Sequence, residues 1–133
     1  MTQRQPKPGS RGLVYDFKTM PHVIVEHSSD IDVKPLLPKL HETAAGFDTV
    51  KPEAIKTRAD MFRFHTVAGS TETSFIHIEF RLLEGRNADL KNQFAEALHR
   101  EAKEFASAQG GNVAVSTHVS ELVKEFYRTE LVT

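Results

Sequence analysis

The feature that most constrains the fold is a long amphipathic pattern over residues 89–107. Apolar side chains recur there every three or four positions, and charged side chains occupy the opposite face. This spacing predicts a helix with one face buried against the rest of the domain. Asn87 is suited to cap its first turn, and Gly110 and Gly111 are suited to follow its end. The apolar positions are Leu90, Phe94, Ala97, Leu98, Ala102 and Phe105.

Four other segments have the composition and alternation of strands. Residues 21–27 are rich in β-branched side chains, with apolar residues on both faces, and residues 55–66 have an extended pattern. Residues 74–82 alternate apolar and polar side chains, as do residues 113–119. A turn is expected over residues 68–72, and the tail from residue 122 to 133 is ambiguous between strand and helix.

A second, shorter helix is expected to begin near Leu36, with Pro38 tolerated in its first turn and Gly46 at its end. The order is then strand, helix, two strands, helix, strand. This order predicts an α+β domain in which two helices cover one face of a four-stranded sheet. Because apolar residues are expected on both faces, we predict that other subunits cover the second face.

Composition limits the classes of function. The chain has 133 residues, the size of one domain, and no cysteine, which excludes disulfides, thiolate nucleophiles and cysteine-ligated metals. A net charge of −1 gives no argument for nucleic acid as a partner, and no apolar run is long enough to span a membrane. These features predict a soluble protein and fit a reducing cytoplasm. Seven histidines occur without a recognisable metal-ligand spacing, so no metal is expected.

The near-neutral net charge of the chain is the sum of two segments with opposite charges. Residues 1–19 contain four basic residues and one acidic residue, a charge of +3, which leaves −4 for residues 20–133. The first eleven residues are polar and include two prolines and a glycine, as in a flexible leader. We therefore divide the chain into a basic extension, residues 1–19, and a domain, residues 20–133.

Five short motifs occur in an order that resembles the 5-carboxymethyl-2-hydroxymuconate isomerases of the tautomerase superfamily. They are MPHVIVE at residues 20–26, LPKL at 37–40, IKTRA at 55–59, FIHI at 75–78, and Gly85-Arg86 before the long helix. The resemblance covers about residues 20–122. It implies a trimer of βαββαβ subunits whose sheets pack together. It also implies a cofactor-independent isomerase in aromatic compound catabolism that interconverts the enol and keto forms of a carboxylated substrate.

The same resemblance implies roles for particular residues. The family's base is an amino-terminal proline, which corresponds to Pro21, and Arg86 would assist it in catalysis. Substrate carboxylates would be bound by Lys56 and Arg58, with His77 as a further hydrogen-bonding group. Lys56 replaces an arginine of the family motif, and lysine cannot reproduce the bidentate geometry of a guanidinium.

Each assignment has a structural alternative. Arg86 could be a surface arginine at a helix start, and Lys56 and Arg58 could lie on a solvated strand face. His77 could be a packed structural histidine.

Pro21 departs from the family pattern because it is internal in this sequence. An amide nitrogen is delocalised into its carbonyl and cannot act as a base near neutral pH. The adjacent Met20 suggests that translation starts there and that the methionine is then removed, leaving Pro21 as the first residue. The alternative is a genuine extension on a non-catalytic trimeric ligand-binding protein of the same fold. In a third interpretation, the extension recruits a partner.

Overall fold

The computed structural model describes residues 21–133, and these form one four-stranded sheet with two helices. The predicted extension, residues 1–19, and Met20 lie outside the described residues. The strands are β1 (His22–Ser28), β2 (Lys56–Phe62), β3 (Ser74–Leu83) and β4 (Val113–Leu122). The helices are α1 (Leu36–Ala45) and α2 (Ala88–Ser107), with single 3₁₀ turns at η3 (Pro52–Ala54) and η4 (Lys124–Phe126).

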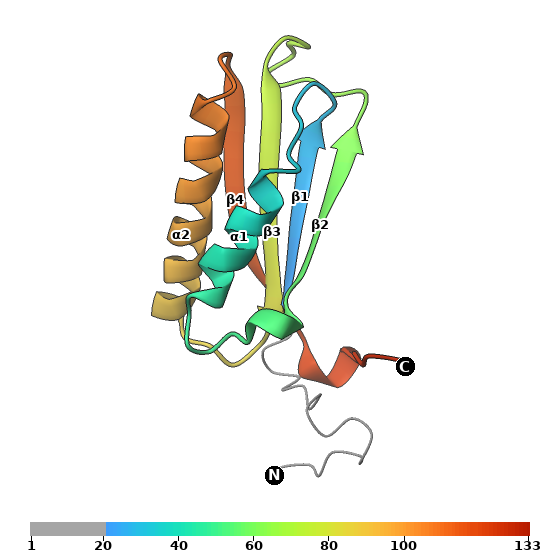
Figure 1. Ribbon diagram of the computed structural model, residues 1–133, viewed down its shortest axis with the longest axis vertical. Coiled ribbons are helices and arrows are strands. Elements are labelled where there is room, and N and C mark those ends of the chain that lie inside the picture. Colours follow the sequence, from blue (N-terminus) through green and yellow to red (C-terminus); the bar gives the residue numbers. More distant parts are fainter. Residues whose placement is uncertain (1–20) are drawn as a thin grey trace.

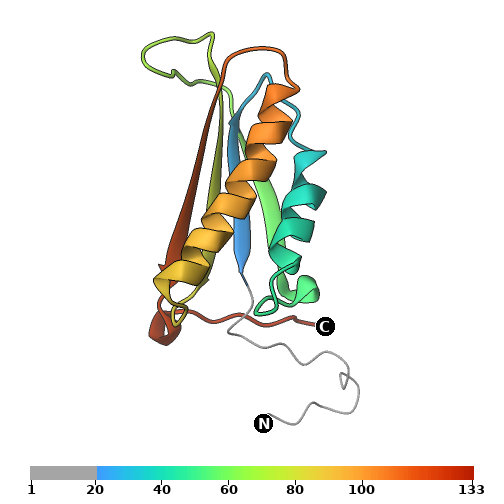
Figure 2. The ribbon, with the colours of Figure 1, turned by 90° about the vertical axis from the view of Figure 1, so that its left-hand side faces the viewer.

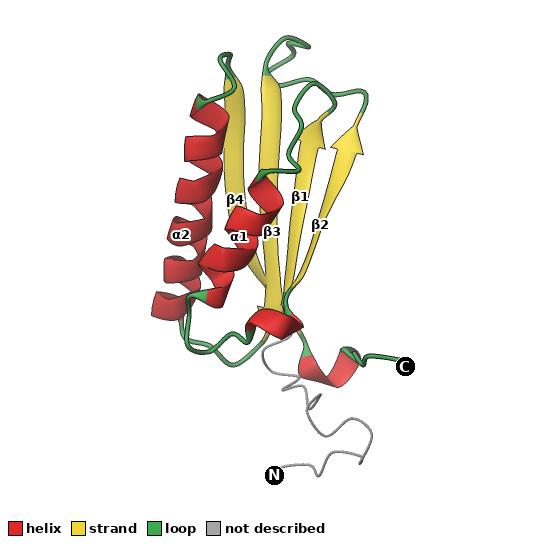
Figure 3. Ribbon diagram, viewed as in Figure 1, coloured by secondary structure: helices red, strands yellow, loops and turns green. Residues whose placement is uncertain are grey.

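The strands lie in the order β2-β1-β3-β4 (Figures 1 and 3). The two central strands, β1 and β3, are antiparallel, and each pairs in parallel with the outer strand that follows it through a helix. The chain thus contains two β-α-β units, β1-α1-β2 and β3-α2-β4, joined by the loop between β2 and β3. This confirms the predicted α+β class and the βαββαβ order.

Local signals in the sequence placed most boundaries correctly. Asn87 caps α2, since its side-chain oxygen accepts a hydrogen bond from the Leu90 amide at 2.9 Å. Gly46 follows α1 at its C-cap, as predicted. The expected turn over residues 68–72 contains Ala68 and Gly69, both with positive φ. The extended segment predicted over residues 55–66 is a strand only over Lys56–Phe62.

Both helices pack on the same face of the sheet (Figure 1). Alternate residues of β3 point toward them, and Ile76, Ile78 and Phe80 are fully buried. Phe94 of α2 contacts the Phe80 ring, with ring centroids 4.9 Å apart, and the Phe47 ring, with centroids 4.2 Å apart. The core therefore lies between the sheet and the two helices, as the amphipathic patterns predicted.

The opposite face of the sheet is mostly polar. Ile24 is buried there, but its cross-strand neighbours are Arg58 and Glu79. Because strand residues alternate between faces, the register assigns most of the polar strand residues to this face. The prediction that the second face is apolar was therefore wrong for most of that face. The polar residues of this face are His22, Glu26, Ser28, Lys56, Arg58, Asp60, His77, Glu79, Arg81, Ser116, His118 and Ser120.

The tail after β4 is neither a strand nor a long helix. It forms η4 and then runs without regular structure beneath the sheet end where β1 begins (Figure 2). The Lys124 amide donates to a carboxylate oxygen of Glu84 at 2.9 Å, which holds the tail against the end of β3. This contact fixes the position from which the following residues reach β1.

Truncation of Phe94 to alanine tests the packing of α2. We expect Phe94→Ala to lower the free energy of unfolding by about 3–5 kcal/mol, because the cavity would be lined by rings that cannot fully close it. Chemical denaturation measures this change. Phe126→Ala is the matched control, since Phe126 is 76% exposed, and its effect should stay below about 0.5 kcal/mol. Equal effects would contradict this account of the core.

Candidate active site

The candidate site lies at the sheet end where β1 and β2 begin. Pro21 is buried there, immediately before β1. Its carbonyl oxygen accepts a hydrogen bond from the Lys56 amide at 3.0 Å, which ties the start of β2 to residue 21. His22 pairs with Lys56 on one side and with Arg81 on the other. The sheet register therefore gathers Lys56, His22 and Arg81 in one row next to Pro21.

His22 is held by two side chains from distant parts of the sequence. Arg58 Nη1 lies 3.0 Å from His22 Nδ1, and Tyr127 Oη lies 2.7 Å from His22 Nε2. The Tyr127 ring also meets the imidazole edge to face, with centroids 5.9 Å apart. Because a guanidinium only donates, Nδ1 must accept from Arg58, and the imidazole hydrogen must lie on Nε2. His22 Nε2–H then donates to Tyr127 Oη.

Electrostatics keep His22 neutral. Burial, the largest cause, and the positive charges of Arg58, Lys56 and Arg81 together lower the pKa of His22 to about 4. A protonated ring would also place an N–H on Nδ1 against the Arg58 donor. The imidazole is therefore uncharged at neutral pH, as the inferred tautomer requires.

Lys56, Arg58 and Arg81 form a cluster of cations at this sheet end. In the part of the chain that the structure describes, no salt bridge involves Lys56, Arg58 or Arg81. Burial and the nearby Arg58 lower the pKa of Lys56, and its ammonium donates to Thr129 Oγ1 at 3.3 Å. Positive charges that cluster without counter-charges favour an anion nearby. Of the predicted site residues, Pro21, Lys56 and Arg58 are thus brought together.

Arg86 follows β3 at the same end of the sheet. Its Nη2 donates to the Thr49 carbonyl at 3.1 Å, and its Nη1 donates to the Leu83 carbonyl at 3.3 Å. The bond to Thr49 joins the loop after α1 to the loop before α2. Arg86 is thus held by backbone carbonyls, and its predicted catalytic role stays a prediction.

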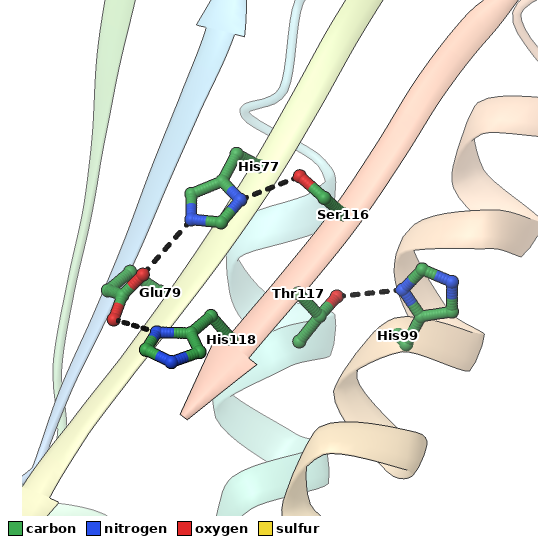
Figure 4. Close-up of polar contacts among 6 residues, drawn as sticks. All are labelled: His77, Glu79, His99, Ser116, Thr117 and His118. Atoms are coloured by element: carbon green, nitrogen blue, oxygen red, sulfur yellow. Dashed lines mark hydrogen bonds and ion pairs between the residues drawn. The ribbon is translucent and has the colours of Figure 1, made fainter. Parts of the chain in front are cut away.

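His77 lies elsewhere on the polar face. It is four residues from Arg81 along β3, about 13 Å at the usual rise of a strand. Its Nδ1 contacts Ser116 Oγ at 2.7 Å, and its Nε2 contacts Glu79 at 3.0 Å (Figure 4). The chain does not bring His77 to the Pro21 end, and its substrate-binding role stays a prediction.

Glu79 is the centre of this second cluster. Its other oxygen lies 2.8 Å from His118 Nδ1, so the carboxylate bridges two histidines (Figure 4). Burial raises the pKa of Glu79, but hydrogen bonds from His118, His77 and Ser120 outweigh that effect and hold the pKa below its usual value. Glu79 is therefore a carboxylate at neutral pH, satisfied by neighbours on β3 and β4.

Sequence reasoning missed three members of the site. They are His22, which contacts Arg58, and also Arg81 and Tyr127. The alternation of β3 places Arg81 on the polar face, and His22 adjoins Pro21, so both carried a local signal. Tyr127 carried none, because its contact with His22 spans 105 residues.

Searches for other kinds of site within residues 21–133 are negative. No helix there is long and apolar enough to cross a membrane. No group of three or more histidine or acidic side chains in that range is arranged to hold a metal ion.

Comparison with known proteins identifies the fold and the family. The structure resembles that of a 5-carboxymethyl-2-hydroxymuconate isomerase from Deinococcus radiodurans R1, with a TM-score of 0.75 and 23% identity over 86% of this chain and 91% of that one. A 5-carboxymethyl-2-hydroxymuconate delta-isomerase gives a TM-score of 0.69 with 16% identity over 87% of this chain and 91% of that one. A fused 4-OT symmetric trimer gives 0.63 with 18% identity over 78% and 88% of the two chains.

These likenesses show that the chain shares the fold of these solved isomerases and of the 4-OT trimer. The family model for 5-carboxymethyl-2-hydroxymuconate isomerase matches residues 21–130. The chain therefore belongs to the 5-carboxymethyl-2-hydroxymuconate isomerase family, as its motifs predicted. A sequence search among curated proteins gave no significant match.

Titration of His22 tests the electrostatics of the site. We expect its imidazole NMR signals to change with a midpoint near pH 4, far below the ordinary histidine value of 6.5. The unfolded chain then binds the proton more readily than the folded one, so the free energy of unfolding should fall as pH decreases from about 6.5 to about 4.

His22→Asn is the matched variant for the stability measurement. The difference between wild type and variant isolates this histidine from the carboxylates that titrate in the same range. A midpoint near 6.5, or identical pH dependence in both proteins, would contradict the proposed environment.

Proposed function

We propose that this protein interconverts the enol and keto forms of an unsaturated carboxylated compound resembling 5-carboxymethyl-2-hydroxymuconate. In this proposal the Pro21 nitrogen is the general base. The observation that carries it is the row of cations beside Pro21, formed by Lys56 and Arg81 with Arg58 next to them, which no carboxylate of residues 21–133 pairs with. Membership of an isomerase family supports the reaction class.

The chemistry depends on a free amine at residue 21. An α-amino group has a pKa of about 7.7–8.0 in water, and both burial and nearby cations lower it. Pro21 is buried beside Lys56 and Arg58. Its nitrogen would then be largely neutral at working pH, able to take a proton from the enol hydroxyl and return it to carbon.

The cations have separate tasks in this reaction. Lys56 and Arg58 bind substrate carboxylates, and Arg86 stabilises negative charge that develops on the enolate oxygen. No cofactor is required for this proton transfer. We expect the working form to be a homotrimer, because the fused 4-OT, a protein with this fold, is a symmetric trimer and the polar face of the sheet is not covered by either helix.

A second candidate follows from the sequence itself. Where Met20 precedes Pro21, the proline nitrogen is an amide and cannot take a proton near neutral pH. The same cationic sheet end would then bind a carboxylated ligand without turnover. The two candidate functions differ only in whether the nitrogen of Pro21 is a free amine or an amide.

Replacement of Pro21 tests the proposed reaction. In a chain that begins at Pro21, we expect kcat to exceed that of the full chain with residues 1–20 retained by about 10²–10⁴-fold, because the amide removes the general base, which contributes that much. Substrate absorbance measures turnover, and light scattering checks that assembly is unchanged. The matched variant is Pro21→Ala in the chain that begins at residue 21, which keeps an amine but loses the rigid ring, and its kcat should fall between those of the two proline forms.

Amino-terminal sequencing of protein from its native source decides which form exists. A first residue of Pro21 supports the isomerase, whereas Met1 or Thr2 favours the binding protein. Turnover by a chain shown by intact mass to retain residues 1–20 would exclude Pro21 as the base.

Removal of the Arg58 side chain tests anion binding. We expect Arg58→Ala to raise KM for the carboxylated substrate by about tenfold or more, since a hydrogen bond to a charged group contributes about 1.5–3 kcal/mol. Steady-state kinetics measure the change. Arg100→Ala removes an exposed guanidinium from α2 and should leave KM unchanged. Equal KM values for wild type and Arg58→Ala would assign Arg58 to a solvated strand face.

A further inference from the structure

The C-terminal segment, residues 123–129, is fixed against the candidate site at both ends. At its start, the Lys124 amide bonds to Glu84 and the Phe126 amide bonds to the Val123 carbonyl, both at 2.9 Å. Near its end, Thr129 accepts a hydrogen bond from Lys56 at 3.3 Å. Tyr127 lies between these anchors and is only partly buried. Figure 2 shows the segment crossing beneath the sheet end where β1 begins.

The tautomer of His22 fixes the role of the Tyr127 hydroxyl. Because Arg58 donates to Nδ1, His22 Nε2–H donates to Tyr127 Oη over the 2.7 Å contact. The phenol oxygen is thus an acceptor in this pair, and its own hydrogen must point to another group. Among the bonds of the described residues, Tyr127 Oη makes no other side-chain or backbone contact. The Tyr127 hydroxyl hydrogen is therefore available to donate to a bound molecule.

Charge determines which acceptor suits this donor. Arg58 is hydrogen-bonded to His22, the partner of Tyr127, and Lys56 is hydrogen-bonded to Thr129, two residues after Tyr127. Two cations are therefore bonded to the neighbours of Tyr127. No carboxylate pairs with these cations within residues 21–133. A hydroxyl that donates beside two positive charges binds an anionic oxygen most strongly. A carboxylate oxygen has the required charge and lone pairs.

We infer that Tyr127 donates its hydroxyl hydrogen to a carboxylate oxygen of the bound substrate. The C-terminal segment then completes the anion site that Lys56 and Arg58 begin. The inference rests on the proposed function for the identity of the substrate, whereas binding of a carboxylate does not require turnover. Arg58 and His22 act as positioning residues for Tyr127, because they set the direction in which its hydrogen points.

Tyr127→Phe removes the donor and retains the ring. The probe is adipate, a saturated dicarboxylate that has no enol and cannot be isomerised. Titration calorimetry should show adipate bound about tenfold to a hundredfold more weakly by Tyr127→Phe than by wild type, the loss expected for a hydrogen bond to a charged group. KM for 5-carboxymethyl-2-hydroxymuconate should rise by a similar factor, with kcat changed less.

Phe126→Leu is the matched control, because Phe126 adjoins Tyr127 but is 76% exposed. It should bind adipate as wild type does. Circular dichroism establishes that each variant is folded at the temperature of the titration. In the wild-type protein, saturation with adipate should also shift the ¹³Cζ signal of Tyr127, assigned with Tyr15→Phe, and this measurement needs no variant at residue 127.

The outcomes separate this inference from the proposed function. Weaker adipate binding by Tyr127→Phe supports the inference even where no isomerase activity is found. Unchanged adipate affinity, an unmoved Tyr127 signal, or absence of adipate binding by wild type would overturn it. Wild-type turnover together with unchanged affinity in Tyr127→Phe would leave the isomerase intact and remove Tyr127 from the site.

Discussion

The antiparallel pairing of β1 with β3 at the centre of the sheet determines where the site residues on the strands lie. It sets the first residue of β1, His22, opposite Arg81 near the end of β3. Since β2 pairs in parallel with β1, Lys56 at the start of β2 lies on the other side of His22. A shift of one residue in either register would turn these side chains to the helix-covered face. The apolar residues of β3 that face the helices fix the register of this strand, and that register in turn places the cationic row.

The charge of this row is tolerated because the histidine within it is neutral. Lys56, Arg58 and Arg81 all disfavour a proton on His22, and burial acts in the same direction. The imidazole then serves as an acceptor for Arg58, which holds the guanidinium without neutralising it. A carboxylate in place of His22 would pair with these cations and remove the attraction for a ligand. The neutral histidine orients Arg58 and leaves its charge for an anion.

Local patterns predicted the elements, but the site depends on contacts that no local pattern records. The spacing of Phe94 and Leu98 identified α2, and the IKTR motif identified Lys56 and Arg58. Tyr127 was missed because the tail has no period, and its position follows from where β4 ends beside β3. The polar face was misjudged because Ile24, buried between Arg58 and Glu79, made β1 look apolar on both sides.

The position of residue 21 is independent of whether its nitrogen is an amine or an amide. The Pro21 carbonyl is bonded to the Lys56 amide, and His22 is the first residue of β1, so the sheet holds residue 21 from its carbonyl side. No bond of its nitrogen is needed for that placement. Processing at Met20 would thus change the chemistry at this end of the sheet from ligand binding to proton transfer while Lys56, Arg58 and Tyr127 keep their geometry. In the proposed function, the chain terminus would supply the base and the sheet would supply the anion site, so one fold could serve either activity.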